Sequence, residues 1–426
     1  MNRIQEALEH KTIFITGATG FLGQPLVEKI LRIAPKVDRL YLLIRPRGQR
    51  GGQTMTAEER LIKELFRSNV FDRLHRSYGD KSRAFLEEKL VAVSGDISQE
   101  GLGIDEALRI RLQEEVDIVI NSAAAVSFDA PLDEALAANV LSAGRIAEFA
   151  NSCEKAILVH VSTAYVNGGN SYSVPETVHR ATSSSETEPI HPKGKFSDVA
   201  REVEHIRKMI SQVEETSRDP KIREELLKEL RKPRRRGKGM TRAVKLESLR
   251  KKWVQSRLTE EGMKWARQRG WNDTYTYTKA LGEQMVLGAR KEVPTVVIRP
   301  SVIESSLSEP SPGWLDGLRM ADPLIVAIGK GRLRSLPLDA SVIIDLVPVD
   351  LVVNALLATI PRAAQEGGVK VYHVATGAKN PVTLGELHLL VYEYFQKNPM
   401  LDRQGEPIRI KPLKFPSRAP SGCNTS

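Results

Sequence analysis

A glycine-rich turn near the N-terminus separates two regular patterns. Residues 11–16 (KTIFIT) form a short β-branched apolar run, and a helical pattern follows through Leu26, Ile30 and Leu31. Between them the sequence reads G-x-x-G-x-x-G from Gly17 to Gly23. A strand, a tight turn and a helix in this order predict the first unit of a parallel α/β sheet.

Six further apolar runs are strand candidates, and helical patterns separate most of them. They span residues 40–44, 90–93, 116–121, 156–161, 295–298 and 369–374. Parallel strands need crossover helices, so this alternation predicts a parallel sheet covered on both faces. We therefore expect an α/β protein with a doubly wound Rossmann-type parallel sheet. The 426 residues also allow a helical insertion and a smaller C-terminal substrate-binding subdomain.

The pattern changes after Ala164, where two helical stretches interrupt the alternation. Apolar residues recur at spacings of four and three from Val199 to Val213, and a second stretch carries Leu246, Leu249 and Trp253 on one stripe. These predict a helical hairpin insertion. The expected domains are a Rossmann-type domain (1–168, 271–305 and 340–378), a basic helical insertion (169–270) and a smaller substrate-binding subdomain (306–339 and 379–426).

The net charge of +10 is concentrated in this insertion. Residues 221–257 contain 15 Lys or Arg and four Glu, which leaves the remainder of the chain close to neutral. The densest run, residues 231–238 (RKPRRRGK), includes Pro and Gly, and its like charges repel one another, so it predicts an exposed, mobile loop.

Composition and cysteine content indicate an ordinary folded protein. With 41% hydrophobic and 27% charged residues, the chain falls outside the disordered and collagen-like classes. Its two cysteines, Cys153 and Cys423, provide neither a disulfide framework nor zinc-finger spacing, so we expect no metal and a reducing, cytoplasmic location. No signal peptide or membrane span is predicted, although peripheral membrane association is compatible with the charge.

The glycine turn is suited to a dinucleotide. Gly17 permits the turn, Gly20 lets the backbone approach a pyrophosphate, and Gly23 lets the helix pack on the strand. The next strand ends in Arg45-Pro46-Arg47 without the acidic residue of NAD-preferring sites, so we predict NADPH, its 2′-phosphate bound by both arginines. Alternatively, these arginines are ordinary surface residues. Candidate cofactor contacts are Thr16, Gly17, Thr19, Gly20, Phe21, Leu22, Gly23, Arg45, Arg47, Asp96 and Ile97.

A tyrosine and a lysine are spaced for acid catalysis. Tyr275 and Lys279 lie four residues apart in a helical pattern and therefore share a face. A nearby ammonium is expected to lower the pKa of the Tyr275 phenol and make it a better acid. Tyr277 points to another side and is expected only to pack. Ser162 and Thr163 end an earlier strand, where doubly wound sheets bind ligands.

Taken together, these segments resemble the fatty acyl-CoA reductases, or male-sterility family, of the extended short-chain dehydrogenase/reductase superfamily. The resemblance runs from about Lys11 to Gly377. Its motifs are ITGATGFLG (15–23), YLLIRPRG (41–48), INSAAAVSF (120–128), HVSTAYVNG (160–168), NDTYTYTKALGE (272–283), IRPSVIE (298–304), EPSPGW (309–314) and DLVPVD (345–350). Family members usually continue with a helical C-terminal domain, so a short form or a fragment of such a protein is expected.

The resemblance implies the reaction and further site residues. It implies Thr163, Tyr275 and Lys279 as the catalytic set, with Asn139 in support, and adds Asn121, Ser122, Ala123, Ser162, Pro300, Ser301 and Val302, together with Tyr275 and Lys279, to the cofactor contacts. The implied reaction is NADPH-dependent reduction of a long-chain fatty acyl-CoA to an aldehyde and then to a fatty alcohol.

Several alternatives stay open. The chain could stop at the aldehyde, as a carrier-protein or acyl-CoA thioester reductase, or act on a sterol or sugar nucleotide, or serve as a non-catalytic NADP-bound scaffold. The basic insertion could be a solvated hairpin without a partner. It could instead bind the phosphates of coenzyme A, an acyl carrier protein or an anionic membrane. Nucleic acid is disfavoured because Trp253 is the only aromatic residue in residues 221–257. The oligomeric state is left open.

Overall fold

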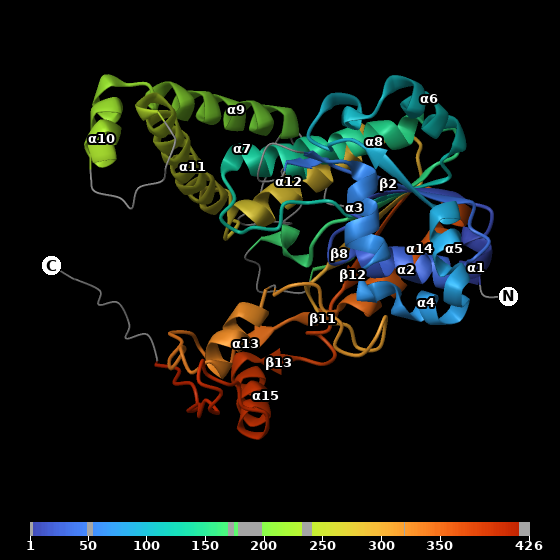
Figure 1. Ribbon diagram of the computed structural model, residues 1–426. Helices are drawn as coiled ribbons and strands as arrows, with labels where there is room; N and C mark the ends of the chain where they lie inside the picture. Colours follow the sequence, from blue (N-terminus) through green and yellow to red (C-terminus); the bar gives the residue numbers. More distant parts are fainter. Residues whose placement is uncertain are drawn as a thin grey trace. The chain divides into compact units, whose positions relative to one another are not determined.

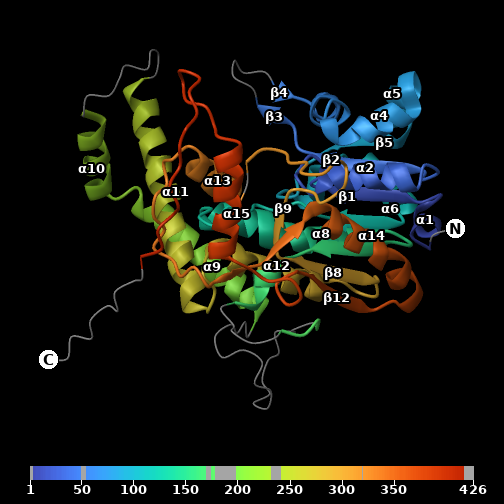
Figure 2. The ribbon, with the colours of Figure 1, turned by 90° about the horizontal axis from the view of Figure 1, so that it is seen from below.

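A computed structural model describes residues 3–48, 54–168, 174–177, 198–231, 241–318 and 320–416. The chain divides into two compact units (Figures 1 and 2). The first comprises residues 1–299 and 356–372, and the second comprises residues 300–355 and 373–426. No described helix combines the length and the apolar character needed to cross a bilayer.

A seven-stranded, mostly parallel sheet forms the centre of the first unit. Its strands are β1 (Thr12–Thr16), β2 (Arg39–Ile44), β5 (Leu90–Ser94), β6 (Ile118–Asn121), β7 (Ile157–Val161), β8 (Thr295–Pro300) and β12 (Val369–Val374), in the spatial order β12-β8-β7-β6-β1-β2-β5. All seven predicted strands are confirmed. Most positions in β1, β2, β6, β7 and β8 are buried, as expected for strands covered on both faces.

The chain changes direction at β1, where the doubly wound topology places its binding crevice. From β1 it continues outward through β2 and β5, and then returns to β6 on the other side of β1. The carboxyl ends of β1 and β6 therefore lie side by side, with Thr16 opposite Asn121. Ligands of such sheets bind at this switch point.

Helices cover both faces of the sheet (Figure 1). They are α1 (Arg3–Leu8), α2 (Gly23–Ile33), α3 (Ala57–Arg60), α4 (Asp72–Tyr78), α5 (Ser82–Lys89), α6 (Glu106–Glu115), α7 (Leu132–Ala135), α8 (Ser142–Ser152), α12 (Thr274–Ala289) and α14 (Val349–Glu366). A core of Phe14, Val119, Ile146 and Phe149 joins the sheet to α8. The remaining strands of this unit are the short pair β3 (Arg47–Gly48) and β4 (Thr54–Met55).

The insertion forms α9 (Val199–Thr216), α10 (Pro220–Arg231) and α11 (Arg242–Gln268). α9 and α11 confirm the two predicted helical stretches, but the expectation of a two-helix hairpin was wrong because α10 lies between them. Within α10 the side chain of Leu226 is buried. Glu224 forms a salt bridge with Lys228 one turn away, which favours a short helix. Arg231 is the last residue of α10, and the rest of the predicted loop lies outside the described residues.

The second unit contains β9 (Val302–Glu304), α13 (Asp322–Gly329), β10 (Ile343–Ile344), β11 (Leu346–Pro348), β13 (Val382–Thr383) and α15 (Leu384–Lys397). Ile328, Val391, Phe395 and Ile410 form its apolar core. The carboxylate of Asp350, in the DLVPVD segment, accepts hydrogen bonds from the backbone N–H groups of Leu307, Ser308 and Glu309. This aspartate therefore holds the start of the EPSPGW segment.

Candidate active site

Thr163, Tyr275 and Lys279 meet where β7 ends. Thr163 follows β7 by two residues, and its hydroxyl shares a hydrogen bond with the Tyr275 phenol. Tyr275 and Lys279 lie one turn apart on α12, whose first turn is capped by Asp273, which accepts a hydrogen bond from the Thr276 amide (2.7 Å). The structure thus brings together the three residues predicted to be catalytic.

The ammonium of Lys279 is deeply buried. The residue is 3% exposed, and its Nζ donates a hydrogen bond to the carbonyl oxygen of Val161 (2.7 Å). Burial lowers the pKa of Lys279 to about 8, while the negative charge of Glu283 acts in the opposite direction. The charge of this lysine is therefore sensitive to pH near neutrality.

The pKa of Tyr275 is raised, not lowered. Burial is the largest cause, followed by the negative charge of Asp273, and together they raise the pKa of the phenol to about 12 despite the hydrogen bond from Thr163. The sequence-based expectation that the ammonium of Lys279 would lower the pKa of Tyr275 was wrong in direction, because burial and the charge of Asp273 determine the shift. Tyr275 is therefore a protonated hydrogen-bond donor at neutral pH.

Asn139 supports this region from a π-helical turn (Leu136–Leu141). Its side chain accepts a hydrogen bond from the Ala125 amide (2.8 Å) and donates to the Ala125 carbonyl (3.1 Å) and to Thr278 Oγ1 (3.0 Å). A Cβ at Gly282 would lie 2.0 Å from the carbonyl oxygen of Asn139, so only glycine lets α12 approach so closely. Asn139 thus connects α12 to the segment that follows β6.

Ser162 belongs to a buried polar network. Its Oγ donates to Glu283 Oε2 (2.7 Å), and the guanidinium of Arg299 donates to both carboxylate oxygens of Glu283. Glu283 and Arg299 are each 1% exposed. This network ties β7, β8 and α12 together, and neither charged residue was among the predicted site residues.

A second buried chain crosses three strands. Thr16 Oγ1 donates to Asn121 Oδ1 (2.7 Å), and Asn121 Nδ2 lies 3.1 Å from His160 Nδ1. Because the amide nitrogen faces the ring, Nδ1 accepts and the imidazole proton lies on Nε2. Burial and then the charge of Lys279 lower the pKa of His160 well below its ordinary value, so the ring is neutral. His160 was not assigned a role from the sequence.

The glycine turn fits a pyrophosphate. Gly17 has a φ of +74°, and a Cβ there would lie within 3 Å of Ser122 and Ala123. Ser122 Oγ donates to the Thr16 carbonyl (2.7 Å), so the turn and the end of β6 form one surface. No described side chain caps the N-terminus of α2 at Leu22; in its first turn the Gln24 amide donates to the Gly20 carbonyl (3.0 Å) and Pro25 has no amide hydrogen, so the fit to an anion rests on the glycine turn itself. Phe21 and Leu22 are buried beneath the turn, whereas Gly20 and Gly23 form its backbone.

Cationic side chains gather beside this turn. Arg60 donates to the Arg45 carbonyl (2.6 Å) and to Thr19 Oγ1 (3.3 Å), and the guanidinium of Arg45 lies 3.6 Å from Asp96. Burial alone would raise the pKa of Asp96, but hydrogen bonds from Ser98 and the charge of Arg45 lower this pKa below its ordinary value. Arg60 was missed from the sequence because it lies on α3, 41 residues from Thr19.

The remaining predicted cofactor residues occupy three places. Arg47 is exposed and begins β3, paired with Met55. Ile97 packs against the core beneath β5. Pro300, Ser301 and Val302 belong to the second unit, where the Ser301 amide donates to the Val374 carbonyl (3.0 Å) and its hydroxyl is buried without a described partner.

One exposed aromatic side chain, Phe128, packs against Tyr275. The ring of Phe128 packs edge-on against Tyr275, with centroids 5.8 Å apart. Phe128, Val126 and Tyr165 are 46%, 55% and 41% exposed. An exposed apolar ring beside the Tyr275 ring favours an apolar substrate.

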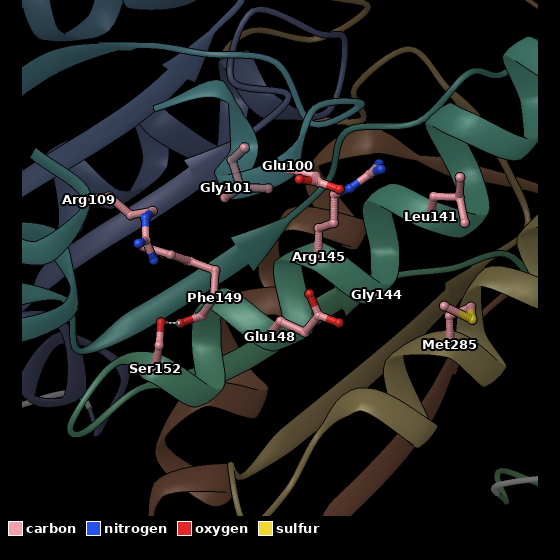
Figure 3. A pocket seen from close by; sticks show the side chains of 11 residues that line it. Glu100, Gly101, Arg109, Leu141, Gly144, Arg145, Glu148, Phe149, Ser152 and Met285 are labelled. Atoms are coloured by element: carbon pink, nitrogen blue, oxygen red, sulfur yellow. Dashed lines mark hydrogen bonds between the residues drawn. The ribbon is translucent and has the colours of Figure 1, made fainter. Parts of the chain in front are cut away.

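A cavity of the first unit lies elsewhere. It has a volume of about 490 Å³ and is lined by α8 together with Glu100, Arg109 and Met285 (Figure 3). Of the described residues that line it, none belongs to the predicted site. Two arginines and two glutamates line it, so neither sign of charge dominates.

Comparisons with known proteins agree with this geometry. Residues 15–356 match the family model described as "Male sterility protein". The chain is 38% identical over 413 residues to "Probable fatty acyl-CoA reductase 5" of Arabidopsis thaliana, covering 96% of this chain and 75% of that protein. It is 34% identical to the "Alcohol-forming fatty acyl-CoA reductase" of Simmondsia chinensis, covering 96% and 76%.

A solved structure shares the fold. The terminal R domain from the myxalamid PKS-NRPS biosynthetic pathway aligns with a TM-score of 0.53 at 22% identity, covering 90% of this chain and 70% of that chain. At this identity the likeness concerns the fold alone.

Proposed function

This chain belongs to the male sterility family, the fatty acyl-CoA reductases, and we propose that it reduces a long-chain fatty acyl-CoA to the fatty alcohol through an aldehyde. It is an oxidoreductase of the Rossmann type that uses a nicotinamide cofactor. The observation that carries the proposal is the hydrogen-bonded pair of Thr163 and Tyr275, with Lys279 one turn further along α12.

The three residues suit both reduction steps. The hydroxyls of Thr163 and Tyr275 donate hydrogen bonds to the thioester carbonyl oxygen as it gains negative charge. The C–S bond then breaks, coenzyme A leaves as the thiol or thiolate, and an aldehyde is formed. In the second step the Tyr275 phenol gives its proton to the alkoxide oxygen to yield the alcohol, and Lys279 holds positive charge beside the phenol.

We propose NADPH as the cofactor. When bound, NADPH supplies the hydride for each of the two reductions. Its pyrophosphate is assigned to the turn from Gly17 to Gly23, its ribose 2′-phosphate to Arg45 and Arg60, and its adenine to Asp96 and Ile97. The strongest support is the pair of guanidinium groups of Arg45, just after β2, and Arg60, on α3. Arg45 lies 3.6 Å from Asp96 and Arg60 lies 2.6 Å from Glu64, so a bound 2′-phosphate would compete with these carboxylates.

The apolar surface beside Tyr275 supports a fatty acyl group as substrate. Phe128 and Val126 are exposed apolar residues that would otherwise remain in water. A sugar nucleotide would need polar partners there. We assign this surface to the first methylene groups of the acyl chain.

The closest alternative is a thioester reductase that stops at the aldehyde, with coenzyme A or a carrier protein as the thiol. Product analysis separates the two: the enzyme is incubated with NADPH and hexadecanoyl-CoA, or with hexadecanoyl-carrier protein. Hexadecanol with two NADPH consumed per chain supports the proposal, whereas hexadecanal with one NADPH consumed supports the alternative. Absence of turnover with either donor, despite NADPH binding, would support the alternative hypothesis of a non-catalytic NADP-bound scaffold.

The exposed face of α11 supports an anionic partner. Arg242, Lys245, Lys251 and Lys252 are exposed and form no described salt bridge. We propose that they bring the protein to an anionic lipid surface, where long-chain substrate accumulates. The proposed compartment is the reducing cytoplasm, in which the buried thiol of Cys153 stays free. Charge reversal at Lys245 and Lys252 should abolish sedimentation with phosphatidylserine vesicles while leaving turnover of micellar substrate unchanged.

A further inference from the structure

A buried carboxylate joins the insertion to the catalytic helix. Glu202 lies on α9 and is 7% exposed. Its Oε1 accepts hydrogen bonds from the Tyr277 phenol (2.6 Å), from Trp265 Nε1 (3.0 Å) and from Arg269 Nε (2.8 Å). Arg269 Nη2 donates to Oε2 (3.2 Å), and its guanidinium lies 4.1 Å from the centre of the Trp265 ring. One carboxylate therefore connects α9, the end of α11 and α12.

Tyr277 is placed to act on the catalytic pair. It lies two residues from both Tyr275 and Lys279, so it emerges from the opposite side of α12. On the side of α12 that carries Tyr275 and Lys279, two hydrogen bonds hold the helix: Lys279 binds the Val161 carbonyl, and Tyr275 binds Thr163. On the opposite side, it is held by Tyr277 on Glu202. A rotation of α12 about its axis would break contacts on both sides at once.

The charge of Glu202 makes this contact directional. Burial alone would raise the pKa of Glu202, but hydrogen bonds from Arg269 and Tyr277 lower this pKa below its ordinary value. The carboxylate is therefore ionised. Burial, then the negative charge of Glu202, raises the pKa of Tyr277, so the phenol keeps its proton and donates it. A phenol bound to a carboxylate forms a stronger and shorter hydrogen bond than a neutral pair does.

Apolar contacts also attach the insertion to α12. Val203, Ile206 and Val213 of α9 pack with Val254 and Leu258 of α11 and with the α12 core residues. Burial of these apolar side chains favours docking of the helices. A buried ionic group within an apolar interface adds little net stability, so its effect is better sought in geometry.

We propose that Glu202 is a positioning residue of the active site, which acts through Tyr277 to fix the rotation of α12 and so places Tyr275 and Lys279 against Thr163. The helical insertion is then part of the catalytic scaffold and not an appendage. This inference rests on the proposed catalytic roles of Tyr275 and Lys279. It corrects the expectation that Tyr277 only packs.

The test compares Tyr277→Phe and Glu202→Gln with wild type in NADPH oxidation driven by hexadecanoyl-CoA. We expect kcat to fall on the order of tenfold in each variant, because small displacements of catalytic groups are costly, with the KM for NADPH unchanged. The double variant should be no slower than Tyr277→Phe, because both changes act through one contact. Glu214→Gln is the matched control: Glu214 lies on the same helix and binds Arg250 of α11 (2.8 Å), and its variant should retain wild-type kcat.

Hydrogen exchange provides a readout that does not need turnover. In both variants the amides of residues 274–279 should exchange faster, while those of β1 and β2 keep their protection. A folded Tyr277→Phe enzyme with wild-type kcat and unchanged exchange in α12 would overturn the inference, as would a loss of kcat that tracks a fall in Tm. If wild type itself fails to turn over acyl-CoA, the proposed function fails, and faster exchange in α12 would still support the positioning role.

Discussion

The Nζ of Lys279 lies 2.7 Å from the carbonyl oxygen of Val161, to which it donates a hydrogen bond. The ammonium is thereby held at the end of β7, two residues before Thr163, with its pKa lowered by burial to about 8. Tyr275 lies one turn before Lys279 on α12, and the pKa of its phenol is about 12. The pH dependence of catalysis should therefore report Lys279.

We predict that kcat/KM for acyl-CoA falls as pH rises through about 8, because kcat/KM follows ionisations of the free enzyme and Lys279 loses its positive charge there. Tyr275 stays protonated throughout this range. Lys279→Arg keeps the positive charge across this pH range. Its kcat/KM should be lower than that of wild type but should not change with pH there. A wild-type profile that stays flat to pH 10 would count against the role of Lys279.

The same lysine affects stability with a definite sign. The folded pKa of Lys279 is below its ordinary value of 10.5, so the folded state binds fewer protons than the unfolded state between pH 8 and 10.5. Its contribution to the free energy of unfolding therefore rises with pH across this window. Lys279→Met should remove this contribution. Urea unfolding at pH 7.5 and at pH 10 measures the free energy of unfolding at each pH, and its increase from pH 7.5 to pH 10 should be smaller in the variant than in wild type.

Arg60 should set the preference for NADPH over NADH. A charge-assisted hydrogen bond contributes about 1.5–3 kcal/mol, so Arg60→Ala should weaken NADPH binding roughly ten- to a hundred-fold and leave NADH binding nearly unchanged. Titration of cofactor fluorescence measures both. Arg83→Ala is the control, because Arg83 is exposed and pairs only with Glu87 on α5 among its described contacts. Equal weakening of both cofactors would contradict a 2′-phosphate contact.

Phe128 should contribute to the choice of acyl chain. Its ring lies beside Tyr275 and is 46% exposed, so covering it with methylene groups removes apolar surface from water. We expect Phe128→Ala to lower kcat/KM roughly tenfold for hexadecanoyl-CoA and much less for butanoyl-CoA. Ile110→Ala, at an equally exposed apolar position on α6, should change neither. An equal loss with both substrates would place the acyl chain elsewhere.

The buried pair of Glu283 and Arg299 should matter for stability. Arg299→Met leaves the Glu283 carboxylate buried without its ion-pair partner, which typically costs about 3–5 kcal/mol of unfolding free energy. Urea denaturation measures the loss, and the double variant Glu283→Leu/Arg299→Met should recover much of it. The exposed pair of Arg362 and Glu366 is the control, since Arg362→Met should have no measurable effect. A stable single variant would show that solvent reaches Glu283.

Much of the sheet, and the placing of Tyr275 and Lys279 on one helix face, was predictable because the signals are local. Buried parallel strands form continuous apolar runs, as in β1, and the four-residue spacing of Tyr275 and Lys279 defines one helix face. Thr163 required the additional step of placing the end of β7 beside α12. Family resemblance supplied that step.

The residues that were missed make contacts between segments distant in sequence. Glu202 lies 75 residues from Tyr277, and Arg60 lies 41 residues from Thr19. No periodicity links such pairs, because their approach depends on the path of the insertion and of α3. The raised pKa of Tyr275 was missed for a related reason: burial depends on tertiary packing, whereas the neighbouring lysine is visible in the sequence.

The most direct test of the proposed function is NADPH oxidation with hexadecanoyl-CoA by wild type and by Tyr275→Phe, with the lipid products identified by mass spectrometry. The account predicts hexadecanol from wild type and a fall in kcat on the order of a hundred-fold or more in the variant, with NADPH binding retained. Hexadecanol formed at the same rate by both proteins would contradict it.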